Sequence, residues 1–458
     1  MPHRQHTSAP LCHPLVRGCI WGARLVPLAV TIGLVCAFFL YALDQVTLLR
    51  MHFPWLLYLL PVAGLLMAFV YSRYGSTSAG GNNLIIEQIH TSGGGVPKRM
   101  APLILLATLI THLFGGSAGR EGTAVQMGGS IATSMATLFK MENRDVRVML
   151  MAGIAGGFGA VFGTPLAGTI FAMEVLVIGR LDIRSLLPCL LTAVVADKTV
   201  ALTGIHHSTA QVSSLLPSAT IGSLALPAFE PLLFAKIALA GVLFGLTSIL
   251  FVELQHAIQH LGKKIRRPLL RPVAGGLAVI GLVWLVGNSD YLGIGTIPAH
   301  PGSVTIASSF AVGGSEPFSW FWKLLFTATT LGSGFKGGEV TPLFFIGSTL
   351  GNSLSILFGS IDHLDLFAAM GFLAVFAAAS NTPLACIVMG VELFGPSCLF
   401  YSIAACYIAY FFSGHTGIYL SQNLHQGDTG TTLRGARRDR LTTPIQFFLP
   451  LHRFKRHR

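Results

Sequence analysis

Two short segments combine glycine, an acid and hydroxyl residues in a pattern that could bind an anion. The first, GREGTAVQMGGSIA, starts at Gly119, and the second, GGEVTPLFFIGSTL, starts at Gly337. In both, an acid stands just before apolar sequence, as at a helix N-terminus inside a membrane. Free backbone N–H groups and the helix dipole attract anions there. A carboxylate at that point, such as Glu121, could occupy the anion site itself and leave it when protonated.

The two segments belong to an internal repeat. Subtracting 119 from 337 gives an offset of 218 residues, which aligns Glu121 with Glu339. The same offset aligns TPLAGTIFAMEVL with TPLACIVMGVELF, and therefore Glu174 with Glu392. Because the intervals agree as well as the letters, we interpret the chain as a duplicated bundle, with halves at about 25–205 and 233–425. Repeats of this kind meet at the substrate site of many transporters.

Other polar residues in apolar sequence are interpreted as structural. Glu174 and Glu392 recur in both halves, which favours a shared role such as bonding exposed backbone. His112 precedes the first acidic motif and is expected to be a hydrogen-bonded core histidine. Intramembrane acids are costly and usually functional, so Glu121 and Glu339 remain the candidates for gating and proton transfer.

Composition requires a lipid environment around most of the chain. Of 458 residues, 52% are hydrophobic and 10% are charged, and the mean hydropathy is +0.67. Soluble domains carry about 25% charged residues. Stretches long enough to span a bilayer include 25–43, 55–71, 233–252 and 398–412. Others are broken by Gly and Pro, which membranes tolerate where backbone lines a cavity. We therefore expect an all-α polytopic membrane protein with broken helices.

The net charge of +12 is concentrated in three regions: the N-terminus, residues 263–271 and residues 434–458. Apart from Phe454 in the tail, aromatic residues do not interleave with these cations, so nucleic-acid binding is not expected. The positive-inside bias predicts a cell (inner) membrane protein with both termini in the cytoplasm. The expected organisation is a basic segment over 1–24, a membrane domain over 25–425 and a basic tail over 426–458. The seven cysteines lack metal-type spacing, and no metal or cofactor is predicted.

At this point the motifs resemble those of a known family. GREGTAVQMGGS resembles the GREGP helix start of CLC chloride channels and chloride/proton antiporters, and GGEVTP takes the place of their GGxFxP segment. GTPLAGTIFAMEVL looks like their NAPLAGxLFxxEE helix, and HTGIYL resembles the segment with their pore tyrosine. The resemblance covers roughly residues 25–425. It implies an inverted-repeat helical bundle in which broken helices meet at the ion site, and a homodimer with one pore per subunit.

The resemblance also assigns roles to individual residues. Glu121 matches the external gating glutamate, and Tyr419 matches the inner pore tyrosine. The anion-coordinating helix starts match Gly119, Arg120 and Gly122 in the first half and Val340 and Thr341 in the second.

Three departures resemble the fluoride/proton antiporter branch of that family. GGNNLIIE replaces GSGxP, so Asn82 or Asn83 stands near the ion-binding serine of chloride members. Val340 replaces the phenylalanine of GGxFxP, between Glu339 and Thr341, and in that branch a matching acid and threonine interact with the gating glutamate.

The third departure is Val175, which stands where chloride/proton antiporters carry a second proton-path glutamate. Fluoride is a hard acceptor that needs strong donors, such as amide N–H groups, hydroxyls or a protonated carboxyl. Two carboxyls close together in low dielectric resist joint ionisation, which would make proton uptake feasible near neutral pH.

We therefore expect a CLC-type halide transporter, with proton-coupled fluoride export through Glu121 as the first hypothesis. The alternatives are a chloride/proton antiporter and a voltage-gated-type chloride channel, so the expected partners are fluoride or chloride, protons and the lipid bilayer. An enzyme is not expected. The remote alternative is a serine hydrolase, because GGSAG formally matches G-x-S-x-G at Ser117, but that motif requires a strand, a turn and a helix.

Overall fold

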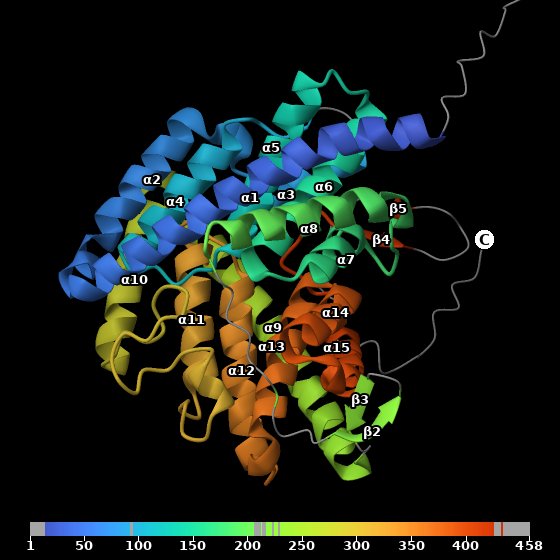
Figure 1. Ribbon diagram of the computed structural model, residues 1–458. Coiled ribbons are helices and arrows are strands. Elements are labelled where there is room, and N and C mark those ends of the chain that lie inside the picture. Colours follow the sequence, from blue (N-terminus) through green and yellow to red (C-terminus); the bar gives the residue numbers. More distant parts are fainter. Residues whose placement is uncertain are drawn as a thin grey trace, which may run out of the picture.

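The protein is a bundle of helices that cross one another at many angles (Figure 1). The computed structural model describes residues 14–91, 95–205, 212, 217–221, 224–227, 230–425 and 432–433. The helices are α1 (Pro14–His52), α2 (Leu60–Tyr74), α3 (Gly81–Thr91), α4 (Met100–Leu113), α5 (Glu121–Leu138), α6 (Asn143–Phe162), α7 (Pro165–Glu174), α8 (Leu186–Leu202), α9 (Pro231–Lys263), α10 (Arg271–Val286), α11 (Ser319–Gly332), α12 (Val340–Leu357), α13 (Leu364–Ser380), α14 (Pro383–Phe394) and α15 (Leu399–Ser413).

The membrane spans predicted from hydropathy are present. Among the described residues, nine helical segments are long and apolar enough to cross a membrane. The four expected stretches lie within Cys19–His52, Pro54–Tyr74, Pro231–Lys263 and Pro396–Ser413. The helix α4, with 14 residues, and the helix α14, with 12, are shorter than a full span of about 20 residues. Such short helices are the broken elements that the Gly- and Pro-rich sequence predicted.

The strands are short and lie at the ends of the helices. The strand β1 (Val177–Ile178) pairs in parallel with β4 (Asn423–His425), which pairs antiparallel with β5 (Thr432–Leu433). The strands β2 (Pro217–Ile221) and β3 (Leu224–Pro227) form a separate antiparallel pair. The β1–β4 pairing joins the end of α7 to the segment after α15, and this contact helps to place Tyr419.

Equivalent helices of the two halves pack in the same way. The helix α5 packs on α6, as α12 packs on α13. A methyl group added at Gly128 would collide with the carbonyl oxygen of Gly153, and one added at Gly347 would collide with that of Gly371. Small residues let membrane helices approach backbone to backbone. Each half therefore brings one broken helix tightly against its neighbour through the same glycine contact.

The recurring glutamates bind the backbone of the opposite half. The carboxylate of Glu174, at the end of α7, accepts hydrogen bonds from the N–H groups of Leu384 (3.1 Å) and Ala385 (2.8 Å) in the first turn of α14. Glu392, in α14, makes the same contact with the first turn of α7, over 2.9 and 2.8 Å. The predicted structural role of both acids is confirmed. We refer to these contacts as the crossed caps.

The chain ends fall mostly outside the described residues. The helix α1 begins at Pro14, so it includes part of the segment 1–24 that was expected to be a basic extension. Residues 1–13 lie outside the described part of the chain, and so does the predicted tail 426–458 apart from β5.

Candidate functional site

The starts of α5 and α12 are joined directly, backbone to backbone. The N–H of Gly119 donates to the carbonyl of Gly338 (2.7 Å), and the N–H of Gly338 donates to the carbonyl of Gly119 (2.8 Å). This reciprocal pair is the hydrogen-bonded pair of an antiparallel ladder. The two helix N-termini therefore meet at one point, at the junction of the halves, deep among buried residues.

The structural equivalence at this point differs by one residue from the sequence alignment. The helix α5 starts at Glu121 but α12 starts at Val340, and the reciprocal pair joins Gly119 to Gly338. The glycine contact of α12 uses Gly347, whose counterpart in α5 is Gly128 and not Gly129. All three observations give an offset of 219 here (338 minus 119). Glu339 is therefore not the positional counterpart of Glu121, as the sequence suggested. The offset returns to 218 at the partner glycines Gly153 and Gly371, so the second half is one residue shorter between its two contact glycines.

Glu121 lies in the junction and is fully buried. Its Oε2 accepts hydrogen bonds from the backbone N–H of Arg120 (3.1 Å) and of Thr341 (3.1 Å). Its Oε1 accepts the hydroxyl of Thr341. The donors come from both halves, and they are the kinds of group that would bind a small anion in place of the carboxylate.

Glycine at the junction is required by space. A Cβ on Gly119 would lie 2.8 Å from Oε2 of Glu121, and one on Gly338 would lie 2.8 Å from the nitrogen of Gly122. The guanidinium of Arg120 adds a cation, with Nε 3.7 Å from Oε1 of Glu121. The expected anion-binding residues Gly119, Arg120 and Gly122 are thus brought together around the carboxylate.

The second acid has a separate set of contacts. Glu339 precedes α12, and its Oε1 accepts a long hydrogen bond from the amide of Gln255 in α9 (3.4 Å). The two acids lie close enough to interact electrostatically, but no hydrogen bond joins them among the described residues. Val340, between Glu339 and Thr341, is buried in the hydrophobic core. Gln255 was not anticipated, because α9 is far from the motifs in the sequence.

Asn82 and Asn83 occupy different sides of the start of α3. The amide nitrogen of Asn82 lies 3.0 Å from the position that a Cβ on Gly122 would take, so it reaches the junction. Its Oδ1 is buried without a partner among the described residues. Asn83 accepts the backbone N–H of Ser421 (3.1 Å), which follows Tyr419 by two residues. Asn82 is the better placed of the two for binding an anion.

Tyr419 completes the same region from the end of the chain. Its ring is buried, with its centroid 6.2 Å from that of Phe171. The phenol lies close enough to Glu121 and Glu339 to interact electrostatically with both. The structure therefore gathers every residue that the sequence proposed, except that Asn83 supports the Tyr419 segment instead of facing the junction.

Two residues near the junction have structural contacts. His112 is buried, and its ring nitrogens lie 2.8 Å and 3.0 Å from the carbonyl oxygens of Thr108 and Ala118. The prediction of a bonded core histidine is confirmed. Ser117 is buried, with its hydroxyl 2.9 Å from that of Thr327, and it lies between two helices. It is not on the strand-turn-helix that a hydrolase elbow requires.

Fold and site together define a multi-pass membrane protein in which two repeated halves place helix N-termini around a buried carboxylate. Residues 63–414 match the family described as Voltage gated chloride channel. The chain belongs to this family, the CLC family.

Individual relatives agree with that assignment. A chloride/fluoride channel protein of Pseudomonas syringae pv. tomato is 44% identical over 407 residues, which cover 88% of this chain and 86% of the relative. The crystal structure of a CLC-type fluoride/proton antiporter is 34% identical, with a TM-score of 0.81, over 90% of this chain and 100% of the other. A slow cyanobacterial Cl⁻/H⁺ antiporter, at 19% identity and a TM-score of 0.70, shares the fold.

Proposed function

We propose that this protein exports fluoride across the cell membrane in exchange for protons, with Glu121 as both gate and proton carrier. The observation that carries the proposal is the seat of the Glu121 carboxylate, which accepts hydrogen bonds from Arg120 and from both donors of Thr341. Protonation removes the charge that these donors bind. The neutral side chain then leaves, and an anion takes its place between the two halves.

Fluoride is favoured over chloride by two features of this chain and by its relatives. The junction offers a hydroxyl and backbone N–H groups, which suit a small hard acceptor. Val175 is buried where chloride/proton antiporters carry a second proton-path glutamate. The 44% identical relative is a chloride/fluoride channel protein, and the 34% identical structure is a fluoride/proton antiporter. Glu339 lies near Glu121 and supplies a second carboxyl for the proton route.

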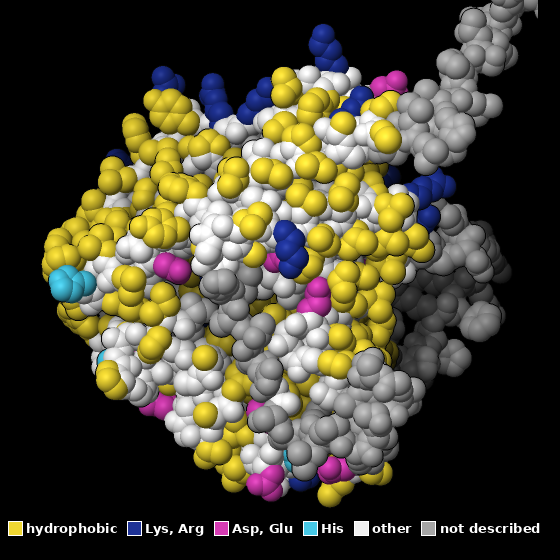
Figure 2. Space-filling model, in the orientation of Figure 1, with side chains coloured by type: hydrophobic (Ala, Val, Ile, Leu, Met, Phe, Trp, Pro, Cys, Tyr) yellow, Lys and Arg dark blue, Asp and Glu magenta, His cyan; other side chains and the backbone are white. Residues whose placement is uncertain are grey.

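The orientation and assembly follow from charge and from the resemblance. Lys and Arg side chains gather at one end of the molecule, and Asp and Glu side chains dominate the opposite end (Figure 2). We assign the cation-rich end to the cytoplasm, together with both termini, in an inner membrane. We also propose a homodimer with one pore per subunit, as the resemblance to the CLC family implies. Chemical crosslinking of the purified protein tests the dimer, and crosslinking that yields only monomer would refute it.

The test of function is ion efflux from proteoliposomes, recorded with fluoride, chloride and pH electrodes together. Fluoride efflux faster than chloride efflux is expected, with protons moving in the opposite direction. Glu121→Gln should lose proton movement, whereas Glu316→Gln, an exposed acid outside the site, should retain it. Equal fluoride and chloride rates without proton movement would refute the proposal in favour of a passive channel. Faster chloride efflux with proton movement would identify a chloride/proton antiporter.

A further inference from the structure

Two cations are buried away from the gate, between α1, α11 and the loop that follows α10. Lys323 of α11 is fully buried, and its ammonium donates to the carbonyls of Tyr291 (3.1 Å) and Gly293 (2.7 Å). It also lies 5.2 Å from the centroid of the Phe345 ring. These contacts are all with neutral groups. The charge of Lys323 is therefore solvated by carbonyls but is not neutralised by an acid.

Arg50, at the end of α1, is the second cation. Its side chain is 6% exposed, and its Nε is buried without a hydrogen-bond partner among the described residues. No ion pair of Arg50 with an acid exists within the described part of the chain. A buried charge without a partner is costly, and proteins normally pair it. Arg50 and Lys323 also repel each other, because they lie within electrostatic reach.

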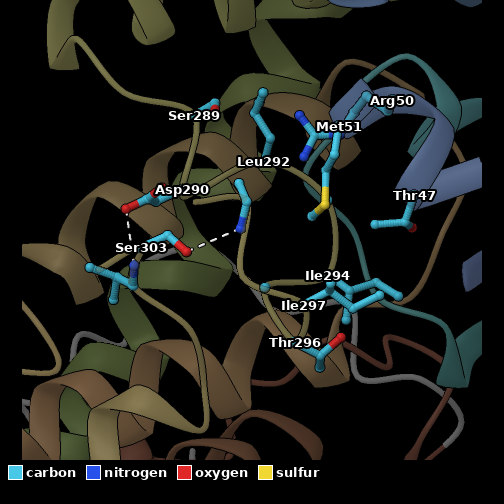
Figure 3. A pocket seen from close by; sticks show the side chains of 14 residues that line it. Thr47, Arg50, Met51, Ser289, Asp290, Leu292, Ile294, Thr296, Ile297 and Ser303 are labelled. Atoms are coloured by element: carbon cyan, nitrogen blue, oxygen red, sulfur yellow. Dashed lines mark hydrogen bonds between the residues drawn. The ribbon is translucent and has the colours of Figure 1, made fainter. Parts of the chain in front are cut away.

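The Arg50 side chain lines a small cavity. The cavity has a volume of about 20 Å³, and its other walls are Thr47, Met51 and residues of the loop between Ser289 and Val304 (Figure 3). A cavity needs roughly 10–15 Å³ to hold one water-sized particle. It is therefore large enough for a single water or fluoride and too small for a phosphate group.

One acid, Asp290, lines the same cavity. Its Oδ2 accepts the backbone N–H of Val304 (3.0 Å), whereas its Oδ1 lies 3.1 Å from Nε2 of His300 but accepts no hydrogen bond within the described residues. The loop residues 293–297 also line the cavity, and within the described residues none of their N–H groups donates a hydrogen bond. The cavity therefore contains one guanidinium and one carboxylate, and with the ammonium of Lys323 beyond its wall the three charges sum to +1.

The cavity lies next to the approach to the gate. Cδ of Arg50 is 3.5 Å from the position that a Cβ on Gly115 would take, and Gly115 lies in the loop that leads from α4 to Glu121. Lys323 lies in α11, the helix that leads to α12. An anion held there would lie beside the loop that ends in the gating carboxylate.

We propose that this cavity, with Arg50 as its main ligand and Lys323 behind it, is a second anion-binding site that holds one water-sized anion, fluoride in preference to the larger chloride. Its role as a station beside the gate rests on the proposed transport function. Its existence does not, because an anion there offsets the excess positive charge of Arg50 and Lys323 over Asp290 whether or not the ion then moves through the gate.

Equilibrium binding tests the site without any transport. Sodium fluoride is titrated by calorimetry into the detergent-purified full-length protein, with gluconate keeping ionic strength constant. Arg50→Met keeps an unbranched apolar stem and removes the guanidinium and its charge. It should bind one fluoride fewer per chain than the wild type. The matched control Arg73→Met changes an exposed arginine and the same net charge, and it should bind as the wild type does. Titration with sodium chloride should give the same binding stoichiometry for Arg50→Met and Arg73→Met.

Equal fluoride stoichiometry in Arg50→Met and Arg73→Met would overturn the proposal and leave water as the occupant. Gel filtration and circular dichroism check that Arg50→Met is folded. If Arg50→Met is not folded, the variant Arg50→Lys is used in its place. Lysine keeps the charge but lacks the planar guanidinium fork, so fluoride should bind to Arg50→Lys about tenfold more weakly than to the wild type. Wild-type affinity in Arg50→Lys would refute the site. Failure of this test leaves proton coupling through Glu121 untouched, so the two proposals fail separately.

Discussion

Removing one of the crossed caps should destabilise the protein without abolishing proton coupling. In Glu174→Gln the carboxylate that accepts two backbone N–H groups of α14 becomes an amide. The single amide oxygen can replace only one of the two carboxylate oxygens as a hydrogen-bond acceptor. The new NH₂ group is a donor and faces the other backbone N–H, which is also a donor. Glu174 is 5% exposed, so little water is available to replace the lost acceptor.

The magnitude follows from these contacts. A hydrogen bond to a charged group contributes about 1.5–3 kcal/mol. Losing one bond and weakening the other should cost about 2–4 kcal/mol for Glu174→Gln. Glu392 is more exposed and makes the equivalent contacts with α7, so water compensates in part and the cost should be about 1–2 kcal/mol. The Glu174 variant should therefore lose about twice as much stability as the Glu392 variant.

The assay is reversible unfolding in mixed detergent and SDS micelles, combined with proton-coupled efflux on the same preparations. The exposed control Glu316→Gln should leave both unchanged. A Glu174→Gln variant of wild-type stability that no longer moves protons would contradict the reasoning, because Glu174 would then be a proton carrier and not a cap.

Three further outcomes are expected. Gly128→Ala should give no folded protein by gel filtration, because the added methyl group collides with the carbonyl of Gly153; normal recovery would show that α5 and α6 can separate. Thr341→Val removes the hydroxyl donor to the gating carboxylate, so the closed gate should be about 10–100-fold less favoured and uncoupled fluoride leak should rise. An unchanged leak would make the hydroxyl unimportant for closure. Gln255→Leu removes the donor to Glu339, so fewer protons should move per fluoride in the electrode assay; an unchanged ratio would argue against this contact.

Much of the fold was predictable because membrane helices are encoded locally. Each long apolar stretch had to become a helix, since no other backbone conformation satisfies its own N–H groups in lipid. The paired roles of Glu174 and Glu392 were predictable because two acids at the same place in two repeats imply one shared contact. The site around Glu121 was predictable because its motif combines a glycine turn, an acid and a helix start.

The register at the junction was not predictable from letters alone. Aligning Gly129 with Gly347 gave an offset of 218, which holds at Gly153 and Gly371 but is one residue short at Gly128 and Gly347. The second half has one residue fewer between its two contact glycines, and the letters alone do not show where that residue is missing. The contact of Gln255 with Glu339 joins elements that are distant in sequence, so no local pattern encodes it. The buried position of Lys323 could have been suspected from the sequence, because Lys323 is the only charged residue in the apolar segment SWFWKLLFTATTLG.

The crossed caps have a consequence for how the chain is built. During synthesis α7 enters the membrane before Glu392 exists, so the N–H groups of its first turn lack their final acceptor until α14 has been made. The first half cannot mature ahead of the second, and the last short helices complete both halves in one event. A ribosome that stops before α14 therefore releases an unfinished first half, which quality-control proteases can recognise by its open backbone.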